Sequence, residues 1–520
     1  KFMPISSLKA FSISLALLTL VAPIIDAEEL SEATIDKTVV RAMKAFEVPG
    51  IAVGIVRGGK LTFAKGYGVR SVDTGEPVTP ETLYGVASNT KAMTVAALAM
   101  LVDKGTLNWD DKVTKWIPEF KLHDDWVTAE FTIRDMLSHR SGLPLGAGDL
   151  MWWPNPTFSR QEVIEGLKHL KPTSSFRSKY DYDNLLYIVA GEIVTRASGI
   201  AWEDFIEQNI FKPIGMDNCR ALPERVPAGS NVATPHMVQD GKLVTTFFSQ
   251  GEPGSSAAAV NCNITGMARW MATLLNGGKL ADGTQVISSQ ALTTMWSAQT
   301  NKNIPASWRR DFNTHFFAYG LGFNLMDRSG AFMVQHSGGL QGMVTYFTML
   351  PEKNMGIIVL TNQMNGAAMR AITDQILDGE LDTVERDWVQ TYADMQKTNR
   401  DDAAKTIAEA ATARPSIITA NLSNAAYAGT YIDAWYGDIK IIETDGKLRA
   451  DFTRTPLLKG TLEAFDGDNF IIRWDDQALE ADSYIRFELE DGKVVGATME
   501  AVSPLTDFSF DFHHLNLVKK

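Results

Sequence analysis

Cysteine is scarce in this chain, where only Cys219 and Cys262 occur among 520 residues. So few thiols exclude a fold held together by disulfides, and the sequence leaves open whether these two pair. The eight histidines are scattered and no HExxH motif occurs, which excludes the usual zinc-hydrolase pattern. We therefore expect no metal ion and no cofactor.

Runs of basic residues are also missing. The formal net charge is -13, and no cluster of Lys or Arg offsets it anywhere in the chain. Because nucleic acids bind mainly through positive charge, a nucleic-acid partner is not expected.

A long hydrophobic run is absent as well. The apolar stretch from Ala10 to Ile25 has 16 residues, fewer than the roughly 20 that a membrane-spanning helix needs. Lys1 and Lys9 precede it, and Ala27 provides a small residue for cleavage. We expect residues 1–27 to be a secretory signal peptide, with a periplasmic or secreted mature protein that has no stable membrane span. An uncleaved N-terminal anchor is the alternative.

The rest of the composition is ordinary for a large globular protein, with 45% hydrophobic and 21% charged residues. Residues 28–48 have an amphipathic helical pattern, and the next segment is typical of two strands joined at Gly58-Gly59. Helical patterns dominate residues 88–214, and apolar, strand-like stretches return within 320–363. Because strands at both ends enclose the helices, residues 28–381 are predicted to form one α/β sandwich domain with a helical subdomain.

The composition changes towards the C-terminus. Residues 382–419 are rich in Ala, Asp, Lys and Thr and are predicted to be a helical linker. Residues 420–520 contain about eight short strands with Asp-Gly turns, which predicts a small antiparallel β-barrel or sandwich without catalytic residues. Its aromatic residues Trp435, Tyr436 and Trp474 are expected at the surface. We therefore expect this domain to dock near a cleft of the first domain, or on a second copy of the chain in a homo-oligomer.

The stretch 84–103 carries the strongest chemical signal. Ser88 and Lys91 lie three residues apart at the start of an Ala-rich helical pattern. A serine in the first helical turn lies beside unpaired backbone amides, which favour the negative charge of an oxyanion. A desolvated Lys91 can accept the proton of that serine. The same spacing also arises by chance, as at Ser6 and Lys9, so the motif needs partners elsewhere.

Two further motifs supply candidate partners. Tyr182 and Asn184 precede an apolar helical pattern, and a strand pattern meets a glycine turn at His336-Ser337-Gly338-Gly339. The three motifs, Ser-x-x-Lys, Tyr-x-Asn and His-Ser-Gly, occur in this order. On these motifs the sequence resembles the serine β-lactamase-like superfamily over about residues 35–380, nearest the class C β-lactamases, D-peptidases and related esterases.

The resemblance implies a fold and roles for these residues. The fold is an antiparallel sheet flanked by helices plus a helical subdomain, followed by a lipocalin-like C-terminal barrel. Ser88 attacks an amide or ester carbonyl, and either Lys91 or Tyr182 is the base, with the pKa of the Tyr182 phenol lowered by the Lys91 cation. Asn184 binds the substrate amide and holds Lys91. The backbone amides of Ser88 and Gly339 form the oxyanion hole.

Some residues have both a functional and a structural interpretation. Tyr182 can be a core aromatic. His336, with Ser337 and Gly338 in the third motif, contacts substrate or packs in a turn. Penicillin-recognising members have lysine at that position, whereas histidine is only partly charged at neutral pH, which favours peptidase or esterase activity. Trp152 and Trp153 either wall an acyl-binding cleft or anchor their loop, and His139 is expected to brace its loop.

The sequence thus predicts an exported, metal-independent serine hydrolase that cleaves amide bonds in peptides through an acyl-enzyme on Ser88. A carboxylesterase or β-lactamase with the same mechanism is the enzymatic alternative. A non-catalytic peptidoglycan- or protein-binding module is the alternative from another class. The expected partner is a peptide or small-molecule substrate.

Overall fold

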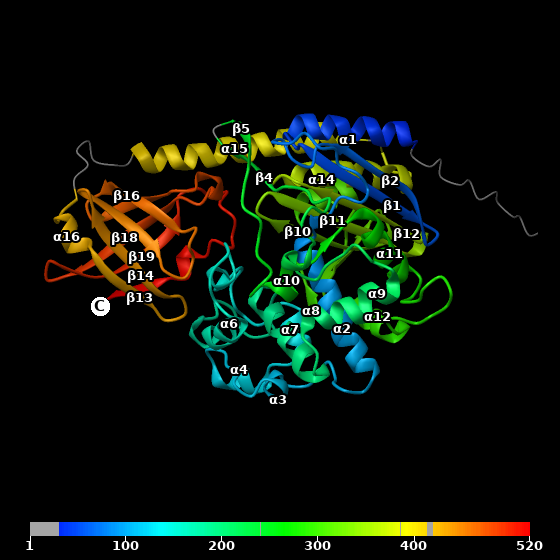
Figure 1. The fold of residues 1–520 in the computed structure, drawn as a ribbon, viewed down its shortest axis with the longest axis horizontal. Coiled ribbons are helices and arrows are strands. Elements are labelled where there is room, and N and C mark those ends of the chain that lie inside the picture. Colours follow the sequence, from blue (N-terminus) through cyan, green and yellow to red (C-terminus); the bar gives the residue numbers. More distant parts are fainter. Residues whose placement is uncertain (1–30, 240, 385, 413–419) are drawn as a thin grey trace, which may run out of the picture.

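The computed structural model describes residues 31–239, 241–384, 386–412 and 420–520. The predicted signal peptide, residues 1–27, lies outside these ranges. The described chain forms a larger body of helices around a sheet and a smaller β-barrel, and one long helix runs from the first towards the second (Figure 1).

An eight-stranded antiparallel sheet forms the centre of the larger body, in the order β2-β1-β12-β11-β10-β9-β8-β7. Strands from both ends of the segment are neighbours in it, because β1 pairs with β12. The predicted hairpin at Gly58-Gly59 is confirmed, since Arg57 pairs with Lys60. The strands are β1 (Gly50–Arg57), β2 (Lys60–Gly68), β7 (Thr300–Asn301), β8 (Phe317–Tyr319), β9 (Asn324–Arg328), β10 (Ala331–Leu340), β11 (Met343–Leu350) and β12 (Met355–Thr361).

Helices cover both faces of this sheet. Side chains of a strand alternate between its faces, and in β1 Ile51 and Val53 belong to one hydrophobic cluster while Ala52 belongs to the other. The first cluster contains α1 (Glu32–Phe46) and α14 (Gly366–Glu380). The second contains α2 (Thr90–Asp103) and α11 (Ile264–Leu275). The predicted fold class is therefore confirmed.

The segment between β2 and β7 is mainly helical, as predicted. A disulfide joins Cys219 to Cys262, so the two cysteines pair. In the described ranges no single helix has the length and apolarity to cross a bilayer, although α7 taken together with the helical stretch up to Ile214 passes that test as a bent pair. The remaining elements here are α3 (Val113–Trp116), α4 (Asp125–Glu130), α5 (Ile133–Leu137), α6 (Arg160–Gly166), α7 (Leu185–Ser198), α8 (Trp202–Ile206), α9 (Lys212–Ile214), α10 (Ser255–Ala258), α12 (Ser289–Met295), α13 (Ala306–Phe312), and the short strand pairs β3 (Tyr84–Gly85) with β6 (Asn261–Cys262) and β4 (His236–Gln239) with β5 (Lys242–Thr245).

The long helix α15 (Trp388–Thr412) lies within the predicted linker and packs along α14 and α1 (Figure 1). Residues 413–419 of that linker are outside the described residues. Eight strands then close into an antiparallel barrel, and three of its hairpins turn at Asp-Gly pairs as predicted. The elements are α16 (Asn424–Tyr427), β13 (Gly429–Asp433), β14 (Gly437–Thr444), β15 (Lys447–Phe452), β16 (Lys459–Asp466), β17 (Asn469–Trp474), β18 (Ser483–Glu490), β19 (Lys493–Ala501) and β20 (Asn516–Lys519).

The aromatic residues expected on the barrel surface are buried in the docked chain, and one of them packs on the larger body. Trp435, Tyr436 and Trp474 are 7%, 1% and 2% exposed. Trp474 stacks on Phe512, and the Tyr436 ring contacts Phe158 of the larger body at 5.7 Å between centroids. Alternation alone could not show that these rings face the barrel core or the interface with the larger body.

The barrel docks on the larger body of the same chain. The Thr157 N–H donates to Arg454 O at 2.7 Å, and the Arg454 guanidinium donates to Glu162 and lies 4.0 Å from the Phe158 ring centroid. The segment 507–509 of the barrel also reaches the cavity described below. The expected docking near a cleft of the first domain is thus observed.

Candidate active site

Ser88 lies in a tight turn immediately before the central helix. The turn Ala87–Asn89 is a 3-10 helix, and α2 begins at Thr90. Ala87 has a φ of 52°, in the left-handed region that a non-glycine residue rarely adopts. Ser88 is therefore presented from a constrained turn at the helix N-terminus, slightly earlier than the helical pattern alone indicates.

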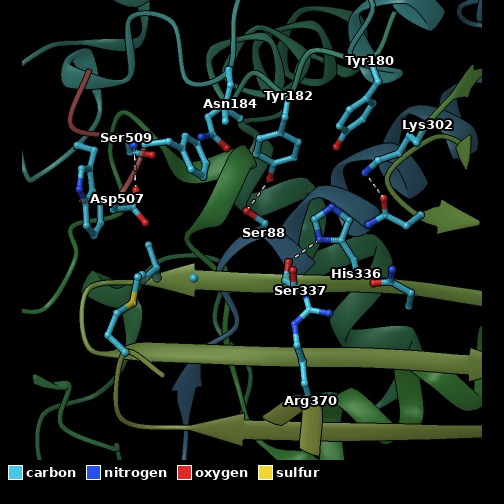
Figure 2. Close-up of a pocket in the computed structure, with 18 of the residues that line it drawn as sticks. Ser88, Tyr180, Tyr182, Asn184, Lys302, His336, Ser337, Arg370, Asp507 and Ser509 are labelled. Atoms are coloured by element: carbon cyan, nitrogen blue, oxygen red, sulfur yellow. Dashed lines mark hydrogen bonds between the residues drawn. The ribbon is translucent and has the colours of Figure 1, made fainter. Parts of the chain in front are cut away.

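The structure brings the first two motifs together around the Ser88 hydroxyl. Figure 2 shows Tyr182 and Asn184 on the side of Ser88 that faces the cavity. Lys91 Nζ donates to Ser88 Oγ at 3.1 Å and to Asn184 Oδ1 at 2.8 Å. The Tyr182 phenol donates to Ser88 Oγ at 2.9 Å. Lys91 is fully buried and donates a third hydrogen bond to Ala257 O at 3.1 Å. A nucleophile, an ammonium and a phenol therefore meet at one oxygen.

Burial sets the protonation of these groups. It lowers the pKa of Lys91 to about 7, although nearby Asp149 and Asp183 act in the opposite direction. Burial raises the pKa of Tyr182 well above its ordinary value. The expected lowering of the Tyr182 pKa is therefore wrong, because desolvation of the phenolate outweighs any favourable charge. Lys91 is the group that can accept a proton near neutral pH.

The third motif lies on β10, beside the Ser88 turn. A Cβ on Gly338 would lie 2.8 Å from Ala87 Cβ and closer still to Val86 O, so only glycine permits this approach. Gly338 is not among the residues that line the cavity, which makes it a packing position rather than a substrate contact. Gly339 does line the cavity, and a Cβ there would meet only Met364 Cε at 3.9 Å; its oxyanion role stays a prediction.

His336 lines the cavity but is only 4% exposed. Its Nε2 lies 3.1 Å from Tyr319 Oη, and its Nδ1 lies 2.6 Å from Ser337 O. Burial, together with the Lys91 charge, lowers the pKa of His336 to about 3. The expected partial charge of this histidine is therefore wrong: it is neutral at physiological pH and supplies no cation.

A cavity of about 420 Å³ opens beside Ser88. Trp152 and Trp153 both line it, and their rings also pack on each other with centroids 5.6 Å apart. They therefore form a wall of the cavity and anchor their loop as well. Its lining comprises Ser88, Leu145, Trp152, Trp153, Tyr180, Tyr182, Asn184, Lys302, Trp308, Phe317, Asn324, Gln335, His336, Ser337, Gly339, Leu340, Met364, Arg370, Asp507, Phe508 and Ser509.

His139 braces this region from behind, as expected. It is fully buried, and its Nδ1 accepts a hydrogen bond from the Asp183 N–H at 3.2 Å. Its ring lies against that of Tyr182, with centroids 4.4 Å apart. The contact holds the phenol in its position on Ser88.

The barrel supplies residues that the sequence did not reveal. Ser509 Oγ donates to Asp149 Oδ2 at 2.8 Å, and Asn184 Nδ2 donates to the same oxygen at 2.8 Å. Asn184 in turn accepts from Lys91. A chain of hydrogen bonds thus leads from the barrel to the lysine. The pKa of the fully buried Asp149 is raised well above its usual range by burial and by Asp183.

No sequence signal pointed to this chain of hydrogen bonds. Asp149 lies in the same loop as the two tryptophans, where only the aromatic pair is conspicuous. Ser509 lies in the connection between β19 and β20 and belongs to no motif. The barrel was expected to dock near a cleft and to hold no catalytic residues, and its residues Asp507, Phe508 and Ser509 line the cavity.

One other cluster has the composition of a metal site. Ligand atoms of Asp511, His513 and His514, all in the barrel, lie within 4.8 Å of one another. Asp511 Oδ2 accepts the Gly148 N–H at 2.6 Å, so this carboxylate already serves the contact between barrel and larger body. None of the three residues lines the cavity beside Ser88.

Comparison with known proteins agrees with this geometry. The Beta-lactamase family model matches residues 35–380, and a domain of unknown function (DUF3471) matches residues 413–519. The unguisins hydrolase ungD' of Aspergillus campestris is 27% identical over 69% of this chain and 68% of its own length. Protein flp of Staphylococcus aureus is 26% identical over 64% of this chain and 63% of its own.

Among solved structures, the octameric penicillin-binding protein homologue from Pyrococcus abyssi aligns with a TM-score of 0.61 at 22% identity. The alignment covers 94% of this chain and 100% of that chain, so the similarity of fold includes the barrel. The family match, the fold and the Ser88 centre lead to one conclusion: the chain belongs to the β-lactamase family and is a serine hydrolase of the β-lactamase-like superfamily.

Proposed function

We propose that this protein is an exported hydrolase that cleaves amide bonds in peptides through an acyl-enzyme on Ser88. The observation that carries the proposal is the pair of hydrogen bonds that Ser88 Oγ accepts from Lys91 and Tyr182 at the wall of the cavity. Ser88, Lys91 and Tyr182 are its catalytic residues.

Acylation begins when Ser88 Oγ attacks the carbonyl carbon and its proton passes to neutral Lys91, whose pKa of about 7 leaves about half of it unprotonated at pH 7. The backbone N–H groups of Ser88 and Gly339 stabilise the oxyanion. The C–N bond then breaks. Tyr182, which is protonated up to this step, donates its proton to the leaving nitrogen and takes up the proton that Lys91 holds. Water then attacks the ester carbonyl of the acyl-enzyme by the same proton transfers, which releases the acid product and free Ser88.

Two observations support export and a peptide substrate. Disulfides persist in oxidising compartments, so the Cys219–Cys262 bond supports export. The signal-like pattern of residues 1–27 supports it as well. The cavity has the size of a small-ligand site, which a short peptide can occupy. Asn184 lines it, and the amide of Asn184 bonds to Lys91 and Asp149. The neutral His336 disfavours penicillin recognition, in which the third motif supplies a cation.

Carboxylester hydrolysis is the second candidate, because the aromatic wall of Trp152 and Trp153 also suits an apolar acyl group. Assembly into a homo-oligomer is proposed by analogy with the octamer named for the Pyrococcus abyssi structure. Light scattering on the purified chain tests it.

A fluorophosphonate probe followed by peptide mapping tests the catalytic assignment. We expect labelling at Ser88 in the folded protein and none in Ser88→Ala. A folded protein that stays unlabelled would be a binding module rather than an enzyme. A panel of D-peptides, L-peptides, p-nitrophenyl esters and nitrocefin then identifies the acyl group, and hydrolysis of esters without any peptide would select the second candidate.

A further inference from the structure

A carboxylate and two imidazoles meet at one point of the barrel, in the turn before its last strand. Asp511, His513 and His514 belong to one short segment, in which residues 512–514 form a 3-10 helix ahead of β20. Asp511 Oδ1 lies 2.5 Å from His514 Nδ1 and 3.4 Å from His513 Nδ1. Both histidines therefore place Nδ1 beside the same carboxylate oxygen.

The spacing of these atoms is close to that of a metal site. Bonds of about 2.0–2.1 Å to a tetrahedral Zn²⁺ place its ligand atoms roughly 3.3 Å apart. The distance from His513 Nδ1 to Asp511 Oδ1 already matches this spacing, and ligand atoms of all three residues lie within 4.8 Å of one another. A rotation of His514 that lengthens its hydrogen bond to Asp511 by about 1 Å or less would make room for the ion.

The buried carboxylate has no permanent cation beside it. Asp511 is fully buried. Within the described ranges its only ion-pair partners are His513 and His514, which carry a charge only when they are protonated. Because histidine is mainly neutral at physiological pH, the two imidazoles alone balance the carboxylate charge poorly. A divalent cation would balance it.

The carboxylate is held in place, whereas the imidazoles are accessible. Asp511 Oδ2 accepts the Gly148 N–H of the larger body, and the neighbouring Phe512 stacks on Trp474 in the barrel core. The side chain of His513 is 53% exposed and that of His514 is 23% exposed. An ion can therefore enter from the surface and keep water as its remaining ligand.

We propose that Asp511, His513 and His514 bind one divalent transition-metal ion, for which Zn²⁺ is the best match. Two imidazole nitrogens and one carboxylate oxygen suit Zn²⁺ and its neighbours Co²⁺, Ni²⁺ and Cu²⁺, whereas Mg²⁺ and Ca²⁺ prefer oxygen ligands alone. The ion fixes the turn that carries Asp511, and Asp511 holds Gly148. It thereby stabilises the docked barrel, and it takes no part in the attack by Ser88.

The probe is Zn²⁺ itself, added to the full-length protein without an affinity tag after treatment with EDTA. Equilibrium dialysis followed by elemental analysis should find one Zn²⁺ per chain, and an excess of Mg²⁺ or Ca²⁺ should not displace it. An ion that binds only the folded chain stabilises it, so Zn²⁺ should raise the melting temperature by about 2 °C or more.

Variants assign the ion to these residues. His513→Ala and His514→Ala should each weaken Zn²⁺ binding by about a hundredfold or more, since loss of a ligand costs more than loss of a residue behind it. The control His315→Ala removes an exposed histidine outside the barrel and should bind Zn²⁺ as the unaltered protein does. Circular dichroism and the melting temperature without metal show whether each variant folds. If His514→Ala folds poorly because Asp511 loses a hydrogen bond, the more exposed His513 variant decides.

Three results would overturn the proposal: the unaltered protein takes up no Zn²⁺, Mg²⁺ or Ca²⁺ displaces the ion, or His513→Ala binds Zn²⁺ as tightly as the unaltered protein. In the last case the ion would occupy another surface position, and Asp511 with His514 would form only a hydrogen bond that shapes the turn. None of these measurements depends on hydrolysis, so their outcome is independent of the proposed function.

Discussion

Raising the pH from about 5 to about 9 should switch on the reaction of Ser88 with a midpoint near pH 7. The reason is the protonation of Lys91, whose pKa is lowered from 10.5 to about 7 by burial. A lysine with the ordinary pKa is neutral in only about one molecule in 3,000 at pH 7, whereas about half of Lys91 is neutral. Burial thus increases the population of competent base by on the order of a thousandfold.

The assay is the second-order rate of fluorophosphonate labelling at fixed probe concentration, with denatured protein as the control for the probe. Because protonated Lys91 cannot accept a proton, the logarithm of the rate should rise with a slope of about 1 below pH 7 and level off above it. Tyr182→Phe should lower the whole curve but leave its midpoint in place. A rate that climbs through pH 9 without a break, or a midpoint that disappears in Tyr182→Phe, would refute Lys91 as the base.

Three further predictions follow from the geometry. Lys91→Ala and Tyr182→Phe should each reduce kcat by on the order of a thousandfold, and the double variant should be little worse, because the two residues share one proton path; multiplicative losses would contradict this coupling. Ser509→Ala should reduce kcat for a small ester by about three- to tenfold with little change in KM, since one hydrogen bond that holds Asp149 is lost, while Ser509→Thr should retain activity; equal losses in both variants would point to packing instead. Gly338→Ala should lower the free energy of unfolding by about 1–3 kcal/mol and abolish labelling, because its Cβ would displace the Ser88 turn; an unchanged melting temperature with full labelling would show that the turn can yield.

Local patterns predicted much of the fold correctly. The hairpin at Gly58-Gly59, the helix after Ser88 and the Asp-Gly turns of the barrel each depend on neighbouring residues, so short stretches of sequence contain the information. Whether Trp435 and Trp474 are exposed or buried depends on which residues pack over them, and no local sequence pattern contains that information.

In the site too, local motifs predict the residues, whereas properties that depend on distant residues are not predicted. Ser88, Lys91, Tyr182 and Asn184 were found because each belongs to a motif, and the structure brings them into hydrogen-bonding contact. The protonation states of His336 and Tyr182 were expected wrongly, because a pKa depends on desolvation by residues far apart in the chain. Lys302, which also lines the cavity, belongs to no motif at all.

The hydrogen bond between Ser509 and Asp149 joins residues that are 360 positions apart in sequence. A ribosome finishes the serine, the lysine and the tyrosine long before it reaches the barrel. Until residue 509 emerges, the nascent chain lacks one wall of its cavity and one end of the hydrogen-bond chain that leads to Lys91. The hydrolase therefore reaches its complete catalytic arrangement only after its barrel has been synthesised, and a copy that stops short of the barrel carries an unfinished centre.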